Sequence, residues 1–125
     1  MRKIIHTENA PAPIGPYSQA VMAGNMLFVS GQIALDPKTG HLQNASVKKE
    51  AEQVMENLRN ILEAADMNFD HVVKTSIFLS NMEHFTTVNE VYQQHFNSNY
   101  PARETMAVKG LPKDVHVEIS MIAVK

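Results

Sequence analysis

Apolar residues recur at every third or fourth position between Ser46 and Asp66, and this spacing predicts the clearest helix of the chain. The recurring residues are Val47, Ala51, Val54, Met55, Leu58, Ile61, Leu62 and Ala65. Ser46 suits the N-cap position, and the opposite, charged face is expected to be solvated. Similar spacing of Phe85, Val88, Tyr92 and Phe96 predicts a second amphipathic helix from about Met82 to Asn97.

Strand patterns surround these two helices. The predicted strands are Tyr17–Ala23, Met26–Leu35, Val72–Leu79, Thr105–Lys109 and Val115–Val124. Gly24-Asn25 separates the first two as a two-residue hairpin turn, and Gly110–Asp114 separates the last two. If this last pair forms a hairpin, its two strands lie next to each other.

The last predicted strand alternates apolar and polar residues at first and becomes apolar on both faces where Ile122 and Val124 occur. A strand covered on both sides indicates helices on one face and a subunit partner or a closed barrel on the other. The order strand, strand, helix, strand, helix, strand, strand is typical of an α+β fold. We therefore expect one domain over residues 1–125, with two helices covering one face of a single sheet.

Composition narrows the function classes. The 125 residues are 44% hydrophobic and 19% charged, which fits a globular domain. A net charge of -2 argues against a dedicated nucleic-acid-binding domain, which would carry a basic stripe. The absence of cysteine excludes disulfides, thiolate nucleophiles and zinc–thiolate sites, and fits a cytoplasmic protein. No run reaches the length of a signal peptide or a membrane span.

Arg103 and Glu118 carry the main candidate chemistry, because both are ionisable residues in apolar, strand-like surroundings. A guanidinium donates two parallel hydrogen bonds to a planar carboxylate, and a nearby glutamate can position or activate water. Pro101-Ala102 leads rigidly into the arginine, which favours a site. The alternative is a plain salt bridge between the two side chains.

Other candidates are weaker. Ser30-Gly31-Gln32 interrupts an apolar strand, so Gly31 either offers its amide to a ligand or marks a bulge that only curves the sheet. Tyr17 follows a proline-rich loop and either lies over a ligand or packs under that loop. Asn89 lies beside the apolar stripe of the second helix and either points to a ligand or is solvated.

Metal and cofactor signals are missing. None of the six histidines has metal-ligand spacing, although His116 shares a strand face with Glu118 by alternation. No glycine-rich phosphate loop occurs, so no nucleotide cofactor is indicated. We expect neither a metal nor a cofactor.

The chain closely resembles the Rid family, the reactive intermediate deaminases also called YjgF-like proteins, and specifically its RidA-type branch. The matching segments are Ala12–Ala20, Phe28–Ile33, Asp36–Gly40, Val88–Tyr92, Tyr100–Arg103, Leu111–Val115 and Val117–Ile119. Together these motifs run nearly end to end and are highly specific.

The resemblance implies a chorismate mutase-like, YjgF-like fold: a single mixed sheet with two helices on one face, in a homotrimer with a central barrel-like core and sites between subunits. It implies hydrolysis of 2-aminoacrylate, 2-aminocrotonate and the related imines to 2-keto acids and ammonia, without a cofactor. This is the activity of a 2-iminobutanoate/2-iminopropanoate deaminase, a hydrolase acting on C=N bonds in metabolite damage control. Neither a membrane nor a nucleic acid is an expected partner.

Carried over to these positions, the resemblance makes Arg103 the clamp for the substrate carboxylate, helped by the Gly31 amide. Glu118 would bind and orient the attacking water, and Tyr17, Ser30 and Asn89 would line the pocket. Many members have a small residue and then a cysteine after the arginine. This chain has Glu104 and Thr105 there, so Thr105 would form a polar wall while Glu104 points away.

A second function class stays open at this point. The chain would then be a non-catalytic regulatory module that binds 2-keto acids or other carboxylates. Such a module needs Arg103 and Gly31 but not Glu118. Ribonuclease and chaperone-like roles are also described in the family, but the net charge and the lack of a basic, aromatic-rich patch disfavour RNA binding.

Overall fold

A computed structural model describes residues 2–125 as one six-stranded sheet with two α-helices. The strands are β1 (Arg2–Ile5), β2 (Ala20–Ala23), β3 (Met26–Gln32), β4 (Val72–Leu79), β5 (Ala102–Ala107) and β6 (Val117–Val124). The α-helices are α1 (Val47–Ala64) and α2 (Phe85–Gln93). Short 3-10 helices occupy Phe69–His71, Met82–His84 and Pro112–Asp114.

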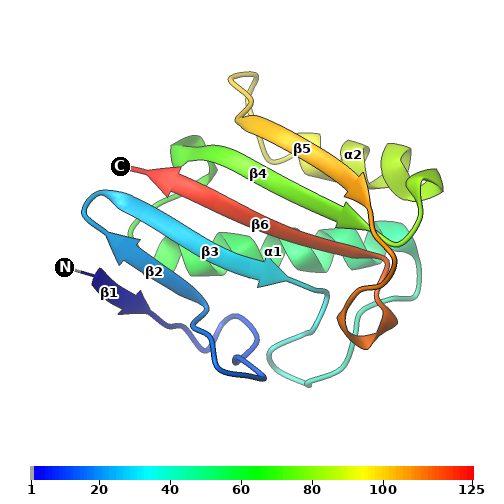
Figure 1. Cartoon of the computed structure of the whole chain (residues 1–125), viewed down its shortest axis with the longest axis horizontal. Coiled ribbons are helices and arrows are strands. Elements are labelled where there is room, and N and C mark those ends of the chain that lie inside the picture. The colour runs from blue at the N-terminus through cyan, green and yellow to red at the C-terminus, as the bar shows by residue number, and fades with distance from the viewer. Residues whose placement is uncertain (1) are drawn as a thin grey trace.

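The sheet has the strand order β1-β2-β3-β6-β4-β5, and both helices cover the same face (Figure 1). Every neighbouring pair is antiparallel except β4 and β5, which are parallel. The predicted α+β architecture, with a single sheet and helices on one face, is therefore confirmed. The strand β1 was not predicted from the sequence.

The predicted hairpin between the last two strands is wrong. The strand β5 pairs only with β4, while β6 lies between β3 and β4. The helix α2 supplies the crossover that two parallel strands need, so β5 continues a β–α–β unit rather than turning back on itself. β6 takes the central position instead, with a hydrogen-bonded neighbour on each side.

Helix α1 begins where the sequence indicates, because the Ser46 hydroxyl accepts a hydrogen bond from the Lys49 amide at 3.1 Å. Its apolar face packs on the sheet and contributes much of the core. Helix α2 is shorter than predicted. After Gln93 the chain tightens into hydrogen bonds between residues three apart, and these carry it to Phe96. Neither helix has the length and apolar character needed to cross a bilayer, within the described residues.

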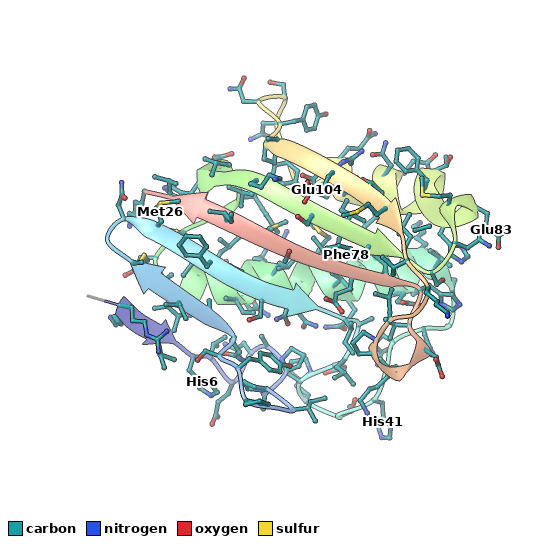
Figure 2. All side chains as sticks on the ribbon, in the orientation of Figure 1. His6, Met26, His41, Phe78, Glu83 and Glu104 are labelled. Carbon is teal, nitrogen blue, oxygen red and sulfur yellow. The ribbon has the colours of Figure 1, made fainter. Side chains whose placement is uncertain are left out.

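The other face of the sheet is uncovered and partly apolar. The strand register aligns Ile4, Val21, Phe28 and Ile122 in one row across four strands. The Phe28 side chain is 43% exposed. Phe78 and Glu104 are labelled near this face in Figure 2. The expectation that a second subunit covers this face stays a prediction.

We predict that Gly24→Ala destabilises the protein by about 1 kcal/mol, because Gly24 has φ +62° in the β2–β3 turn and a new Cβ would meet no atom within 4 Å. The cost is therefore backbone strain alone. Gly110→Ala is the matched control, because Gly110 also has open space around it but no left-handed backbone. Urea unfolding measures both variants, and equal stabilities would contradict the prediction.

Candidate active site

Glu118 lies on the uncovered face of the sheet, directly against the backbone of Gly31. The pairing of β3 with β6 shifts register between Val29 and Gln32, so a bulge does interrupt the strand at Ser30-Gly31, while a role of the Gly31 amide toward a ligand stays a prediction. A Cβ added to Gly31 would lie 2.8 Å from Cδ of Glu118, which is too close for any side chain. Glycine therefore lets the carboxylate lie this close to the backbone, and a larger residue would push the Glu118 side chain away.

The Glu118 carboxylate borders a cavity of about 230 Å³ near the ends of the β3 and β6 strands. Its lining is Pro11, Ala12, Ile14, Tyr17, Gln19, Gly31, Gln32, Ile33, Leu35, Pro112, Lys113 and Glu118. Burial raises the pKa of the Glu118 carboxyl. A carboxylate in a mostly apolar cavity with a raised pKa is a typical candidate for acid–base or water-binding chemistry.

The buried side chain of Gln19, which is 1% exposed, holds the loop that forms one wall of this cavity. Its Oε1 accepts a hydrogen bond from the Thr7 amide at 2.8 Å, and its Nε2 donates to the Thr7 and Pro11 carbonyls at 2.9 Å each. The sequence analysis missed Gln19. The feature that could have identified it is a glutamine at the start of an apolar strand, just after a proline-rich loop.

Ser30 and Tyr17 contact this loop as well. The Ser30 hydroxyl donates to the Ser18 carbonyl at 2.6 Å, and Ser30 is absent from the cavity lining. Tyr17 lines the cavity while its hydroxyl accepts from the Ile14 amide at 3.4 Å. The structure thus brings Tyr17, Gly31 and Glu118 together and gives Ser30 a supporting place behind them.

Arg103 lies on the opposite face, where α2 covers β5. Its Nη1 donates to Oδ1 of Asn89 at 2.7 Å. The guanidinium carbon is 5.1 Å from the ring centroid of Tyr92 and 5.7 Å from that of Phe85. These contacts aim the guanidinium along α2 beside a second cavity of about 300 Å³. The lining is Asn89, Tyr92, Gln93, Tyr100, Pro101 and Arg103.

Thr105 and Glu104 follow the predicted alternation. The Thr105 hydroxyl is buried without a hydrogen-bond partner among the described residues. Glu104 points to the uncovered face, where it accepts a hydrogen bond from Ser76 at 2.7 Å and has Lys74 3.6 Å away. The Ser76 hydrogen bond and then the Lys74 charge lower the pKa of Glu104. Glu104 therefore does not compete for the Arg103 guanidinium.

Arg103 and Glu118 do not meet within one chain, so the adjacent-strand geometry expected from the sequence is wrong. Arg103 is in register with Thr75 of β4, whereas Glu118 is in register with Phe78, three residues further along the same strand. Standard strand spacings place their Cα atoms about 14 Å apart. The side chains also point to opposite faces, which excludes an intrachain salt bridge.

His116 does not share the Glu118 face, because it precedes β6 and its Nδ1 lies 2.9 Å from Oε1 of Glu50 on α1. The sequence analysis missed Glu50 too, although it falls at helical spacing within the apolar stripe of α1. Across residues 2–125 no three His, Asp or Glu side chains gather closely enough to hold a metal ion.

Comparison with known proteins assigns the chain to a family. The family model described as Endoribonuclease L-PSP matches residues 7–125. A human protein named 2-iminobutanoate/2-iminopropanoate deaminase is 45% identical over 125 residues, covering 100% of this chain and 91% of the human protein. The chain belongs to the Rid family.

Solved Rid-type structures have the same fold. The Rid-family protein YyfA from Yersinia pestis, described as of unknown function, matches with a TM-score of 0.97 at 40% identity, over 100% of both chains. Escherichia coli TdcF with bound serine matches with a TM-score of 0.94 at 43% identity, over 98% of both chains. The Rid sheet and its two helices are therefore shared by this chain throughout its length.

We predict that Glu118→Gln is more stable than the wild type at pH 7. The folded state binds the Glu118 proton more tightly than the unfolded state, because burial raises its pKa. The stability that this protonation contributes is present at low pH and lost as pH rises through the folded pKa. A neutral glutamine avoids that loss, so the difference from wild type should shrink as pH falls below the ordinary carboxyl range.

Urea unfolding at pH 7 and pH 4 measures this difference, with Glu63→Gln on the exposed face of α1 as the control. Glu118→Gln that is no more stable than wild type at pH 7 would contradict the prediction.

We also predict that Gly31→Ala is destabilising only while the Glu118 side chain is present. The three atoms nearest to a Cβ added at Gly31 all belong to Glu118. Gly31→Ala should therefore cost about 1–3 kcal/mol alone and clearly less in the Glu118→Ala background. A double-mutant cycle by urea unfolding measures the coupling, and strictly additive effects would disprove the contact.

Proposed function

We propose that this Rid protein is a homotrimeric hydrolase that deaminates 2-enamine and 2-imine acids, such as 2-aminoacrylate and 2-aminocrotonate, to 2-keto acids and ammonia. The observation that carries the proposal is that an arginine with free N–H groups and a half-buried glutamate with a raised pKa line two separate cavities. The name of the human relative supports the choice of substrate. The proposal treats residues 1–125 as one domain that acts in the cytoplasm.

Arg103 is suited to hold the substrate carboxylate. Asn89 accepts from one guanidinium nitrogen, and no other Arg103 hydrogen bond occurs within residues 2–125. The remaining N–H groups are therefore available for a planar anion, which a guanidinium binds with two parallel hydrogen bonds. TdcF binds serine, which carries the same carboxylate next to a nitrogen-bearing carbon.

A complete site needs a second copy of the chain. Arg103 is exposed beside α2 at one edge of the sheet, while Glu118 lies on the uncovered face of the same molecule. A head-to-tail contact that brings Arg103 of one copy to Glu118 of the next can close into a ring. Three copies would also cover the apolar row that includes Phe28, and this supports a trimer.

The reaction itself consumes one water. The enamine first takes up a proton at C3 and gives up one from its nitrogen, which makes it the imine. The water oxygen then bonds to C2 while the C=N π electrons move to the nitrogen, which is protonated. Cleavage of the C–N bond releases ammonia and leaves the 2-keto acid after loss of the hydroxyl proton. No cofactor takes part.

In this scheme the Glu118 carboxylate accepts a hydrogen bond from the attacking water and orients it toward C2. The Gly31 amide helps hold the substrate, and Tyr17 closes the same cavity. Ser30 supports the loop over the cavity. The unpartnered Thr105 hydroxyl lies beside Arg103 as a polar wall in place of the cysteine found in many members.

The test couples a threonine or serine dehydratase to 2-keto acid detection, with and without the purified protein. We predict faster keto acid release with wild type and loss of that acceleration in Arg103→Ala and in Glu118→Ala, both still assembled. No acceleration by folded wild type, together with carboxylate binding that survives Glu118→Ala, would favour the non-catalytic binding module instead.

Mixed trimers test where the site lies. Arg103→Ala and Glu118→Ala subunits are co-expressed with different tags, and the mixed species are purified. If each site takes Arg103 and Glu118 from different subunits, every purified mixed trimer has about one third of its sites intact, and activity returns to roughly that fraction of wild type. Mixed trimers without activity would disprove an intersubunit site.

A further inference from the structure

The Glu50 carboxylate is the most deeply buried charged group in the described part of the chain, at 0% exposure. It lies in the first turn of α1, where a negative charge is favoured by the helix dipole. Its Oε2 accepts hydrogen bonds from the amides of His116 at 2.7 Å and Val117 at 3.1 Å. Its Oε1 lies 2.9 Å from Nδ1 of His116.

The hydrogen bonds from the His116 and Val117 amides to Glu50 take the place of a strand neighbour that β3 does not supply. The strand β3 ends at Gln32, which pairs with Ile119, so the residues that enter β6 extend beyond it. On the other side, the Ser80 amide donates to the His116 carbonyl at 3.0 Å. The entry to β6 is therefore held between β4 and the carboxylate of Glu50. Without that carboxylate, two backbone amides would lose their acceptor in the protein interior.

Glu118 is the next residue after this clamped pair. Its side chain lies against Gly31 on one side and borders the cavity on the other, so a shift of the Val117 backbone would displace the carboxylate. We propose that Glu50 is a positioning residue for Glu118, acting from the helix side of the sheet through the backbone of His116 and Val117. This inference rests on the proposed function, because it assigns Glu118 the role of holding water.

His116 adds a side-chain contact to the same clamp. Its ring lies edge-on to His84, with 5.1 Å between the centroids, so it links the entry of β6 to the turn before α2. The imidazole also fixes the orientation of the Glu50 carboxylate, since it meets the oxygen that the backbone amides leave free. A glutamine at position 50 can reproduce this pattern, with its carbonyl facing the amides and its NH₂ facing Nδ1.

The experiment compares Glu50→Asp, Glu50→Gln and the control Glu63→Asp, which makes the same shortening on the exposed face of α1. Glu50→Asp withdraws the carboxylate by one methylene, so kcat should fall roughly 10- to 100-fold. KM should change less than about twofold, because Arg103 binds the substrate carboxylate. Glu50→Gln should keep kcat within about threefold, and Glu63→Asp should match wild type.

A second measurement does not depend on activity. Carbon-13 NMR of labelled glutamate carboxyls follows the titration of Glu118, assigned with Glu118→Gln. In Glu50→Asp the Glu118 pKa should move toward its ordinary value, because the displaced carboxylate becomes more hydrated, whereas Glu63→Asp should leave it unchanged. If wild type shows no deamination but this shift appears, the proposed reaction fails while the positioning of Glu118 by Glu50 stands.

Two outcomes overturn the inference. One is a folded Glu50→Asp variant with unchanged kcat and an unchanged Glu118 titration. The other is a folded Glu50→Gln variant that loses kcat tenfold or more, which would assign the effect to charge rather than to position. This second outcome decides the matter even if Glu50→Asp does not fold.

Discussion

Successive side chains of a β-strand point to opposite faces of its sheet, and the candidate site depends on this alternation more than on any single contact. In β5 it sends Arg103 to the helix side and Glu104 to the open side. In β6 it sends Glu118 to the open side and keeps Ile119 in the core. A slip of one residue in either strand would exchange these faces and dismantle both halves of the site.

The open-side half shows how a carboxylate is kept in a poorly solvated place. Gly31 lets Glu118 lie against the backbone, Gln19 holds the loop that covers the cavity, and Glu50 holds the entry to β6. The contacts made by Gln19 and Glu50 are hydrogen bonds to backbone, so the position of the carboxylate follows from main-chain geometry. The raised pKa of Glu118 shows that burial disfavours the charged carboxylate, and this lowers the stability of the folded state at neutral pH.

Local patterns in the sequence were enough to predict α1, β4 and the β2–β3 turn, because periodicity, an N-cap and a glycine turn are all properties of short segments. The partner of β5 was not predictable in this way. The turn before β6 is the same whether the chain doubles back on β5 or passes over to lie beside β3, and only tertiary packing decides between them. Arg103, Gly31 and Glu118 were found as candidates from the sequence.

Their arrangement was not found, because strand order decides which residues share a face. Gln19 and Glu50 escaped notice for a related reason. A buried polar residue has no periodic signature of its own, and its importance depends on backbone groups that are distant along the chain.

The central place of β6 has a consequence for how the molecule is made. It is the last strand in chain order, yet it joins the β1–β2–β3 meander to the β4–α2–β5 unit. During synthesis these two pieces of sheet cannot join until β6 has been made, because β6 is synthesised after both and is the strand that pairs with each of them. Arg103 and Asn89 can come together early within one local unit, whereas the cavity around Glu118 arises only at the final, long-range pairing step. In a nascent chain the arginine half of the candidate site therefore forms before the glutamate half.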